Sequence, residues 1–282
     1  MRFANDAESF LKLHDAAAKT IETLAGDTRL GFAAHSLRAV RRDGLAATLS
    51  AIPNGPVHIH IAEQQAEVEE VKAAWGQRPV AWLYENHAVD QRWCLVHATQ
   101  MEAHETEMLA KSKAVAGICP ITECNLGDGI FDGKRFFESQ GRFGVGTDSN
   151  IRISLSEELR IFEYTQRLRD QARAVLATPS ASTGRVLLEG AARGGAQAVG
   201  RDSGAIDVGR YADFFALDKN ATELFDKDED MILDSYIFAG DDHLITDCWS
   251  AGRHVVQDGR HVKRDAITAR YKQAITALKQ RL

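Results

Sequence analysis

The sequence predicts an α/β fold built around a parallel sheet, and two observations point to it. Short apolar runs of strand length alternate with segments whose apolar residues recur at helical spacing, the pattern of βα units joined by right-handed crossovers. Three of these runs also end in a residue type that binds metal ions. Because the carboxyl ends of parallel strands meet at one face of a sheet or barrel, we expect these residues, His60, His97 and Asp148, to converge.

The elements of the first half follow from this alternation. Residues 1–28 are predicted to form a helix, because apolar side chains from Phe10 to Leu24 make a stripe along one face. A strand is predicted next, at 29–34. Further strands are predicted at 56–62, 93–97, 114–118 and 142–147, with helices near 43–51, 64–75, 101–112 and 132–139.

Beyond Asp148 the pattern is helical, around residues 155–168 and then over 182–188 and 190–199. The stretch 203–218 is the clearest signal of a domain change, because a glycine turn and an aspartate precede an apolar strand there. We therefore predict one domain over residues 1–202 and a second over 203–282.

The second domain is predicted to be a small sheet followed by a helix. Strands at 245–251 and 253–257 are joined by a turn at 258–260. The terminal helix is expected to span residues 266–282. Its apolar side chains, through which it is expected to pack, are Ile267, Tyr271, Ile275 and Leu278.

Composition fits a globular protein of 282 residues, long enough to bury the core of one large domain with a small appendage. The formal net charge of −6 and the lack of a basic run argue against a nucleic-acid surface. No apolar stretch approaches the roughly 20 residues of a membrane span, and no signal-peptide pattern is present, so a cytoplasmic protein is expected. The four cysteines form no CxxC pair and are expected to be reduced core thiols.

The run from Pro56 to Gln64 carries the most chemical information. In a strand, His58 and His60 share one face while the alternate apolar residues pack on the other, and Glu63 follows where the strand ends. A neutral imidazole can bind a divalent ion, and a carboxylate beside it can carry protons. Histidines in apolar strands are more often core or strand-end residues than ligands, however, so this run alone does not establish a metal site.

Two further runs favour the metal site. Residues 93–97 form an apolar run that ends in His97, and residues 144–150 place Asp148 after a glycine-bearing turn. Taken singly, His97 is also consistent with a core histidine, and Asp148 with a helix cap ahead of residues 154–158. Three such endings in order make coincidence a weak explanation.

Five strings of residues carry a family resemblance: His35–Val40, His58–Gln64, Cys94–Thr99, Cys119–Gly129 and Gly146–Asn150. They resemble the amidohydrolase superfamily of metal-dependent deaminases and, within it, the deiminases that act on N-formimino-L-glutamate. The string Thr122–Gly129 and the pair Glu63–Gln64 are typical of these deiminases. The resemblance covers nearly the whole chain and implies a partial (β/α)8 TIM-like barrel, a remnant of a small β-sandwich and a C-terminal helix.

One element of the superfamily has no counterpart at the start of this chain. The first barrel strand of the superfamily ends in a His-x-His pair that supplies two metal ligands, whereas the only such pair here, His58 and His60, matches a later strand. By resemblance the chain enters the barrel about midway. We therefore expect either a part of a longer enzyme or a site completed by something else, with an unpaired edge in the small sheet.

The resemblance also implies a role for each matching residue. His60 would bind the metal ion, and Asp148 would both contact the ion and accept a proton from water. His97 would polarise that water or the imino group of the substrate, while Glu63 would carry a proton to the departing nitrogen. One divalent ion is implied, zinc in the first place and iron as the alternative, because imidazole and carboxylate suit several metals.

The implied small-molecule substrate carries two carboxylates, for which His35, Arg38 and Gln64 are the implied partners. Arg38 can hold a carboxylate in a bidentate fork, although an arginine that merely opens a surface helix is the alternative. The implied reaction converts N-formimino-L-glutamate and water to N-formyl-L-glutamate and ammonia, a step of histidine degradation, in a homodimer. A deaminase of a purine or triazine ring, such as guanine, and a fragment that cannot hold metal are the alternatives.

Overall fold

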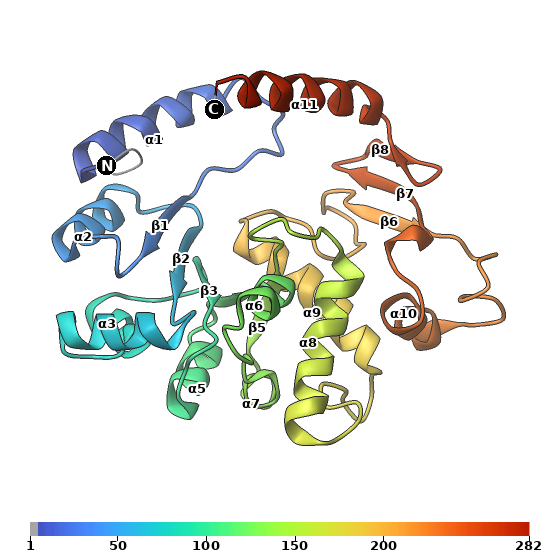
Figure 1. Ribbon diagram of the computed structural model, residues 1–282, viewed down its shortest axis with the longest axis horizontal. Coiled ribbons are helices and arrows are strands. Elements are labelled where there is room, and N and C mark those ends of the chain that lie inside the picture. Colours follow the sequence, from blue (N-terminus) through green and yellow to red (C-terminus); the bar gives the residue numbers. More distant parts are fainter. Residues whose placement is uncertain (1–4, 282) are drawn as a thin grey trace.

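The computed structural model describes residues 5–281, which form two sheets and the helices around them (Figure 1). The larger sheet is parallel and contains five strands in sequential order. These strands are β1 (Phe32–Ser36), β2 (Val57–Ile61), β3 (Trp93–His97), β4 (Val115–Ile118) and β5 (Arg142–Val145). The predicted α/β fold is therefore confirmed, and the sheet is the wall of a partial (β/α)8-type barrel.

Helices connect and follow these strands. They are α2 (Arg42–Ala51), α3 (Gln65–Trp75), α4 (Pro79–Asn86), α5 (Ala103–Lys111), α6 (Pro120–Leu126), α7 (Gly133–Glu138), α8 (Leu155–Asp170) and α9 (Thr183–Ala198). A further helix, α1 (Ala7–Ile21), precedes β1 and contacts α2. Within residues 5–281, no helix is both long and apolar enough to cross a bilayer.

Burial along β2 shows the alternation that the sequence predicts. Val57, Ile59 and Ile61 are buried, whereas His58 and His60 between them are partly exposed. The apolar side chains join the main core, to which β1, β3 and β5 also contribute. Along β2 the two faces therefore differ, with packing on one side and histidines on the other, while Cys94 and Val115 of the neighbouring strands form a second, small apolar cluster.

Some predicted boundaries were wrong. β1 begins at Phe32 rather than at residue 29, because its partner strand begins at Val57, just after a proline that has no N–H to donate. β1 also ends at Ser36 rather than at residue 34, so His35 lies within it. The helix predicted over 1–28 spans Ala7–Ile21, and residues 1–4 lie outside the described residues.

Other helices differ from the prediction in number. The two segments predicted at 182–188 and 190–199 form the single helix α9. Sequence reasoning also missed α4 and α6, which have eight and seven residues. Each begins with a proline in its first turn, Pro79 and Pro120, which is the signal that could have revealed them.

Helix α9 lies directly against β5, and glycine permits this contact. A Cβ atom on Gly194 would overlap the backbone carbonyl of Phe143 in β5. By contrast, nothing lies within 4 Å of a Cβ placed on Gly195, the next residue of the same helix. Substitutions at Gly194 and Gly195 can therefore distinguish the effect of close packing on stability from the effect of helix propensity.

Substitution Gly194→Ala is expected to lower the free energy of unfolding by about 2 kcal/mol or more, because α9 must move away from β5 to admit the methyl group. Gly195→Ala is the matched control and should be neutral or stabilising by up to about 1 kcal/mol, since alanine favours helix. Urea unfolding followed by circular dichroism measures both values. Equal stabilities for the two variants would show that the helix does not rest on β5 as described.

The second sheet is antiparallel and small. Its strands are β6 (Phe214–Leu217), β7 (Ile245–Ser250), β8 (Arg253–Gln257) and β9 (Arg260–His261), in that order. The helix α10 (Glu229–Phe238) and the 3-10 turn η1 (Asp242–Leu244) lie between β6 and β7, and α10 packs against α8 and α9. Strand β6 pairs only with β7, so among the described residues it is an edge strand, as expected.

Arginine side chains join this sheet to the segment before β1. Arg201 donates to Asp213 just ahead of β6 at 2.9 Å and to Asp27 at 3.0 Å. Arg253 of β8 also donates to Asp27, at 2.7 Å. Asp27 receives both arginines and so ties residues 22–31, which pass through turns between α1 and β1, to the small sheet.

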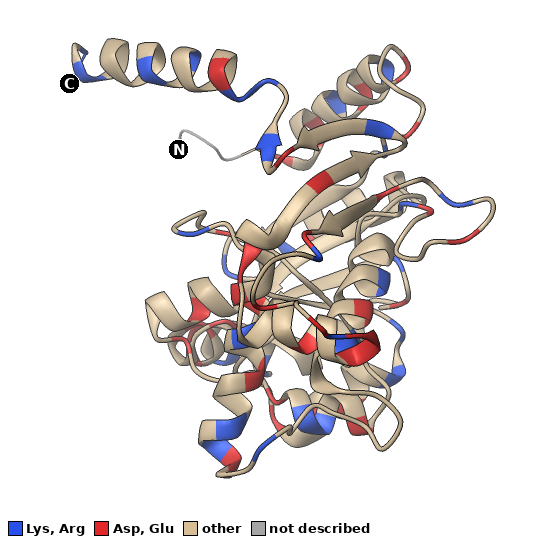
Figure 2. Cartoon of the chain, turned by 90° about the vertical axis from the view of Figure 1, so that its right-hand side faces the viewer, with Lys and Arg blue, Asp and Glu red and all other residues tan. Residues whose placement is uncertain are grey.

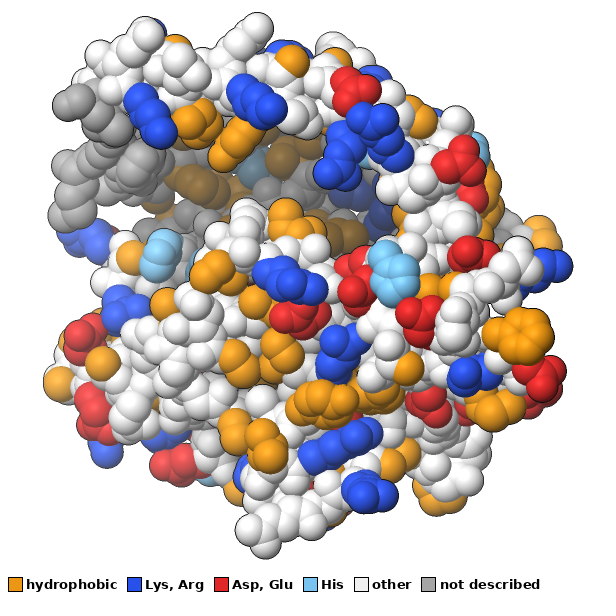
Figure 3. Space-filling model, turned by 45° about the vertical axis from the view of Figure 1, so that its right-hand side comes forward, with side chains coloured by type: hydrophobic (Ala, Val, Ile, Leu, Met, Phe, Trp, Pro, Cys, Tyr) orange, Lys and Arg blue, Asp and Glu red, His pale blue; other side chains and the backbone are white. Residues whose placement is uncertain are grey.

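The terminal helix α11 (Arg264–Lys279) does not pack as predicted. It has no buried residue, and Ile267, Tyr271 and Leu278 are 53%, 64% and 53% exposed. Figure 2 shows α11 extending away from the rest of the chain. Figure 3 shows hydrophobic side chains among basic ones at the top of the molecule, above a hollow. Helical spacing correctly predicted the helix, but spacing does not show whether another part of the chain packs against its apolar residues.

Candidate active site

The sequence-predicted residues His60, His97 and Asp148 meet at the carboxyl end of the parallel sheet. One ligand atom from each lies within 4.8 Å of the others. His60 is the fourth residue of β2, His97 ends β3, and Asp148 follows β5. The topology thus gathers side chains from strands that are far apart in the sequence.

His60 is oriented by the strand beside it. Its Nδ1 donates to the backbone carbonyl of His35 in β1 at 2.7 Å, which leaves a lone pair on Nε2. The ring lies between those of His35 and His97, with centroids 5.2 Å and 5.5 Å away. An imidazole fixed through one nitrogen by a carbonyl is the usual arrangement of a metal-binding histidine.

His97 is almost completely buried and is surrounded by carboxylates. Its Nδ1 lies 3.2 Å from Glu123, while Nε2 lies 3.8 Å from Glu63 and 4.0 Å from Asp148. Burial acts to lower the pKa of His97, but the hydrogen bond to Glu123 and the three negative charges outweigh it, so the pKa is raised. Glu123 therefore fixes the ring and directs Nε2 toward Glu63 and Asp148.

Substitution Glu123→Gln is expected to lower the pKa of His97 in the metal-free protein, because glutamine keeps the shape and the acceptor oxygen but removes the charge. The pKa is measured by NMR titration of the imidazole. His87 is the internal control, since burial alone lowers its pKa and it should titrate unchanged. A His97 pKa equal in the two proteins would mean that Glu123 does not act on the ring.

Glu63 lies beside these groups, just beyond β2. Burial raises its pKa, and the nearby carboxylates of Asp128 and Glu67 act in the same direction, against the opposing effect of His97. A carboxyl group that keeps its proton to higher pH is suited to exchange protons with a substrate. This property agrees with the proton-carrying role that the resemblance implies.

The chain leaves the strands through strained backbone. The φ angles of Ala62, His97 and Asp148 are 49°, 66° and 44°, a left-handed conformation that costs non-glycine residues about 1–3 kcal/mol each. At the end of β2, the buried Glu67 carboxylate stabilises the turn by accepting the N–H groups of Ala62 at 3.1 Å and Glu63 at 2.8 Å. These exits turn the polar side chains toward one another.

The three predicted substrate-binding residues differ in position. His35 faces His60, whereas Arg38 pairs with Glu70 on α3 at 3.6 Å, a partly exposed ion pair. Gln64 donates through Nε2 to Asp128 at 2.8 Å. The partly exposed ion pair between Arg38 and Glu70 contributes about 0–1 kcal/mol to stability, so Arg38 can leave Glu70 and bind another anion.

Sequence reasoning assigned no role to Glu123 or Asp128, although both lie in the string that it singled out. Each contacts a predicted site residue, His97 and Gln64 respectively. Their place in that string was the available signal, but it does not identify their partners.

A second group of possible metal ligands consists of His97, Cys119 and Glu123. Burial raises the pKa of the Cys119 thiol, and Glu123 already accepts the Cys119 N–H at 2.8 Å, so this group fits an ion poorly. The set of His60, His97 and Asp148 offers two imidazoles and a carboxylate, which fits a divalent ion. All four cysteines are free as predicted, but only Cys94 and Cys119 are in the core, since Cys124 is exposed and Cys248 is partly buried.

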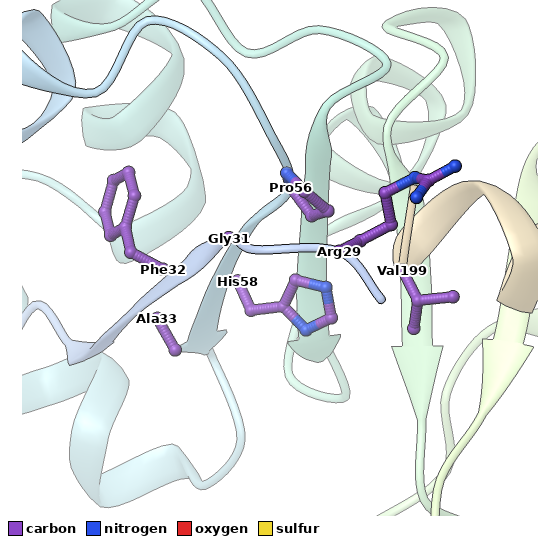
Figure 4. Close-up of a pocket in the computed structure, with 7 residues that line it drawn as sticks. All are labelled: Arg29, Gly31, Phe32, Ala33, Pro56, His58 and Val199. Carbon is purple, nitrogen blue, oxygen red and sulfur yellow. The ribbon is translucent and has the colours of Figure 1, made fainter. Parts of the chain in front are cut away.

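A separate hollow lies at the opposite, amino-terminal end of β1 and β2 (Figure 4). His58 lines it and hydrogen-bonds the carbonyl of Ala198 at 2.7 Å. None of His60, His97 and Asp148 lines this hollow. The lining residues are Arg29, Gly31, Phe32, Ala33, Pro56, His58 and Val199.

Comparison with known proteins agrees with this geometry. Residues 2–255 match the amidohydrolase family. The chain is 46% identical over 279 residues to the formimidoylglutamate deiminase of Pseudomonas aeruginosa, covering 98% of this chain and 61% of that protein. The chain thus spans about three fifths of the length of this relative.

Two solved structures share the fold. The amidohydrolase from Brucella melitensis has a TM-score of 0.93 at 45% identity, covering 98% of this chain and 61% of that one. The adenosine deaminase from Xanthomonas campestris, with bound zinc, has a TM-score of 0.81 at 25% identity, covering 94% and 62%. Together with the family match over residues 2–255, these findings establish that the chain belongs to the amidohydrolase family.

Proposed function

We propose that the protein hydrolyses N-formimino-L-glutamate to N-formyl-L-glutamate and ammonia. The proposal rests on the convergence of His60, His97, Asp148 and Glu63 at one end of the sheet. The 46% identity to a formimidoylglutamate deiminase supports this substrate over other amidines. The homodimer, the cytoplasmic location and the place in histidine degradation stay predictions from the resemblance.

The residues present fit a divalent metal ion, with His60 and Asp148 as the proposed ligands and His97 beside them. We propose zinc, which the Xanthomonas relative contains, with iron as the alternative. When bound, such an ion supplies a Lewis acid that can lower the pKa of water to about 7.

The side chains would share the proton transfers. Asp148 takes a proton from the attacking water. His97 donates a hydrogen bond through Nε2 in its protonated form, which its raised pKa favours, while its Nδ1 donates to Glu123. Water oxygen bonds to the formimino carbon, and the bond from this carbon to the terminal nitrogen then breaks. As it breaks, the new hydroxyl gives its remaining proton to the Glu63 carboxylate and becomes the formyl carbonyl. Glu63 delivers the proton that this nitrogen needs to leave as ammonia, a task for which its raised pKa is suited.

The test is ammonia release from N-formimino-L-glutamate by protein supplied with zinc or ferrous ion, with N-formyl-L-glutamate measured in parallel. We expect equal amounts of the two products. Release of ammonia from guanine but not from N-formimino-L-glutamate would instead indicate a ring deaminase. A folded protein that neither retains metal nor releases ammonia would be a catalytically incompetent fragment.

A further inference from the structure

Asp128 is a buried acid beside the proposed site. It is 4% exposed and lies in the turn between α6 and α7. Its N–H donates to the carbonyl of Glu123 at 2.9 Å, and its own carbonyl accepts the side-chain amide of Gln100. These two contacts fix the backbone of Asp128 and thus the place of its carboxylate.

The carboxylate of Asp128 is only half satisfied. Oδ1 accepts Nε2 of Gln64 at 2.8 Å, while Oδ2 is buried without a hydrogen-bond partner. Among the described residues, no cation forms an ion pair with Asp128. A buried carboxyl group whose one partner is a neutral amide has no cation to compensate it, and such a group calls for an explanation.

Asp128 also fixes the orientation of the Gln64 side-chain amide. A carboxylate only accepts hydrogen bonds, so the Gln64 group that faces it must be the NH₂. The Gln64 carbonyl oxygen then points elsewhere, and it is not among the buried atoms that lack a partner. Gln64 follows Glu63 directly, so its amide oxygen is a further hydrogen-bond acceptor in the segment after β2.

The two sides of the site therefore differ in charge. His35 lies on the β1 side of His60, and Arg38 follows β1 and is held only by its ion pair with Glu70, whereas Glu63, Gln64 and Asp128 lie beyond β2. A ligand with carboxylates at one end and an N–H-rich cation at the other matches this arrangement. N-formimino-L-glutamate is such a ligand, because an amidine is protonated at neutral pH.

We propose that Asp128 is a specificity residue that selects a cationic amidine over a neutral amide, by adding negative charge beside Glu63 and by holding the Gln64 carbonyl free to accept N–H groups. This inference rests on the proposed function. Asp128 acts through Gln64 and through its charge, so it is a positioning residue rather than a catalytic one.

The test compares two stable analogues that differ only at the group in question. N-carbamimidoyl-L-glutamate carries a cationic guanidino group, and N-carbamoyl-L-glutamate carries a neutral ureido group on the same skeleton. Calorimetric titration of the zinc-supplied protein gives both dissociation constants. The variant is Asp128→Asn, which keeps the acceptor for Gln64 and removes the charge, and Asp15→Asn, exposed on α1, is the matched control.

We expect the unchanged protein and Asp15→Asn to bind the guanidino compound at least about tenfold more tightly than the ureido compound, as charge-assisted hydrogen bonds warrant. Asp128→Asn should lose most of this preference by weaker guanidino binding alone. A merely structural role would weaken both ligands equally and leave the ratio unchanged. Equal weakening of both ligands in Asp128→Asn overturns the inference. So does a protein without substitutions that binds neither analogue, or that binds the two equally well.

These outcomes are separable from those of the proposed function. Ammonia release from N-formimino-L-glutamate without a preference for the guanidino analogue leaves the function standing and removes the role of Asp128. The preference without ammonia release leaves the recognition by Asp128 standing and contradicts the proposed reaction.

Discussion

Replacement of Asp148 by asparagine is expected to remove tight metal binding and to lower the rate of ammonia release by more than about 100-fold. Even residues that only support a metal ligand change affinity or activity by about 10–100-fold, and Asp148 is proposed both as a ligand and as the proton acceptor. Asparagine has nearly the same shape and, like aspartate, tolerates the left-handed backbone found here, with φ of 44°. The fold should therefore survive.

The measurement is metal per chain by elemental analysis after dialysis, followed by the ammonia assay. Asp15→Asn controls for the general effect of removing one negative charge. If Asp148→Asn retained one tightly held ion per chain, Asp148 would not be a ligand, and the ion would have to be bound elsewhere.

Replacement of Glu63 by glutamine is expected to leave metal content unchanged but to reduce the rate by about 10²–10⁴-fold, the usual contribution of a positioned general acid or base. Glutamine occupies the same space but cannot carry a proton to the departing nitrogen. Because the proposed role needs Glu63 protonated and its pKa is raised, the alkaline limb of the pH–rate profile should lie above the ordinary carboxyl range.

Glu69→Gln is the matched control, because Glu69 is exposed on α3 and bonds only to Gln65 at 2.8 Å. Its rate and pH profile should equal those of the unchanged protein. A Glu63→Gln variant with a normal rate would exclude Glu63 as the proton carrier and would direct attention to His97.

The sequence was sufficient to predict the parallel sheet and the convergence of His60, His97 and Asp148, because both depend on local patterns. Alternation along β2 showed which residues share a face, and parallel topology then required the strand ends to meet. Predicting the roles of Glu123 and Asp128 would have required long-range information. Their partners, His97 at the end of β3 and Gln64 at the start of α3, are distant in the sequence, and no local pattern reveals such contacts.

The helices show the same distinction. The terminal helix α11 was predicted correctly from spacing, but the prediction that its apolar residues pack was wrong, since packing depends on what lies opposite. Short α4 and α6 were missed because one or two turns contain too few residues to show a helical period. The division of the chain after residue 202 stays a prediction.

The left-handed backbone at Ala62, His97 and Asp148 sets a limit on how robust this protein can become. These positions lie where strands deliver their polar side chains, so relaxing the backbone there would also misdirect the groups that the reaction needs. Stabilising substitutions are therefore more compatible with activity in the helices than at the strand exits. Substitutions that raise thermal stability would therefore be found in the helices, whereas the residues at the strand exits would stay unchanged to keep the activity.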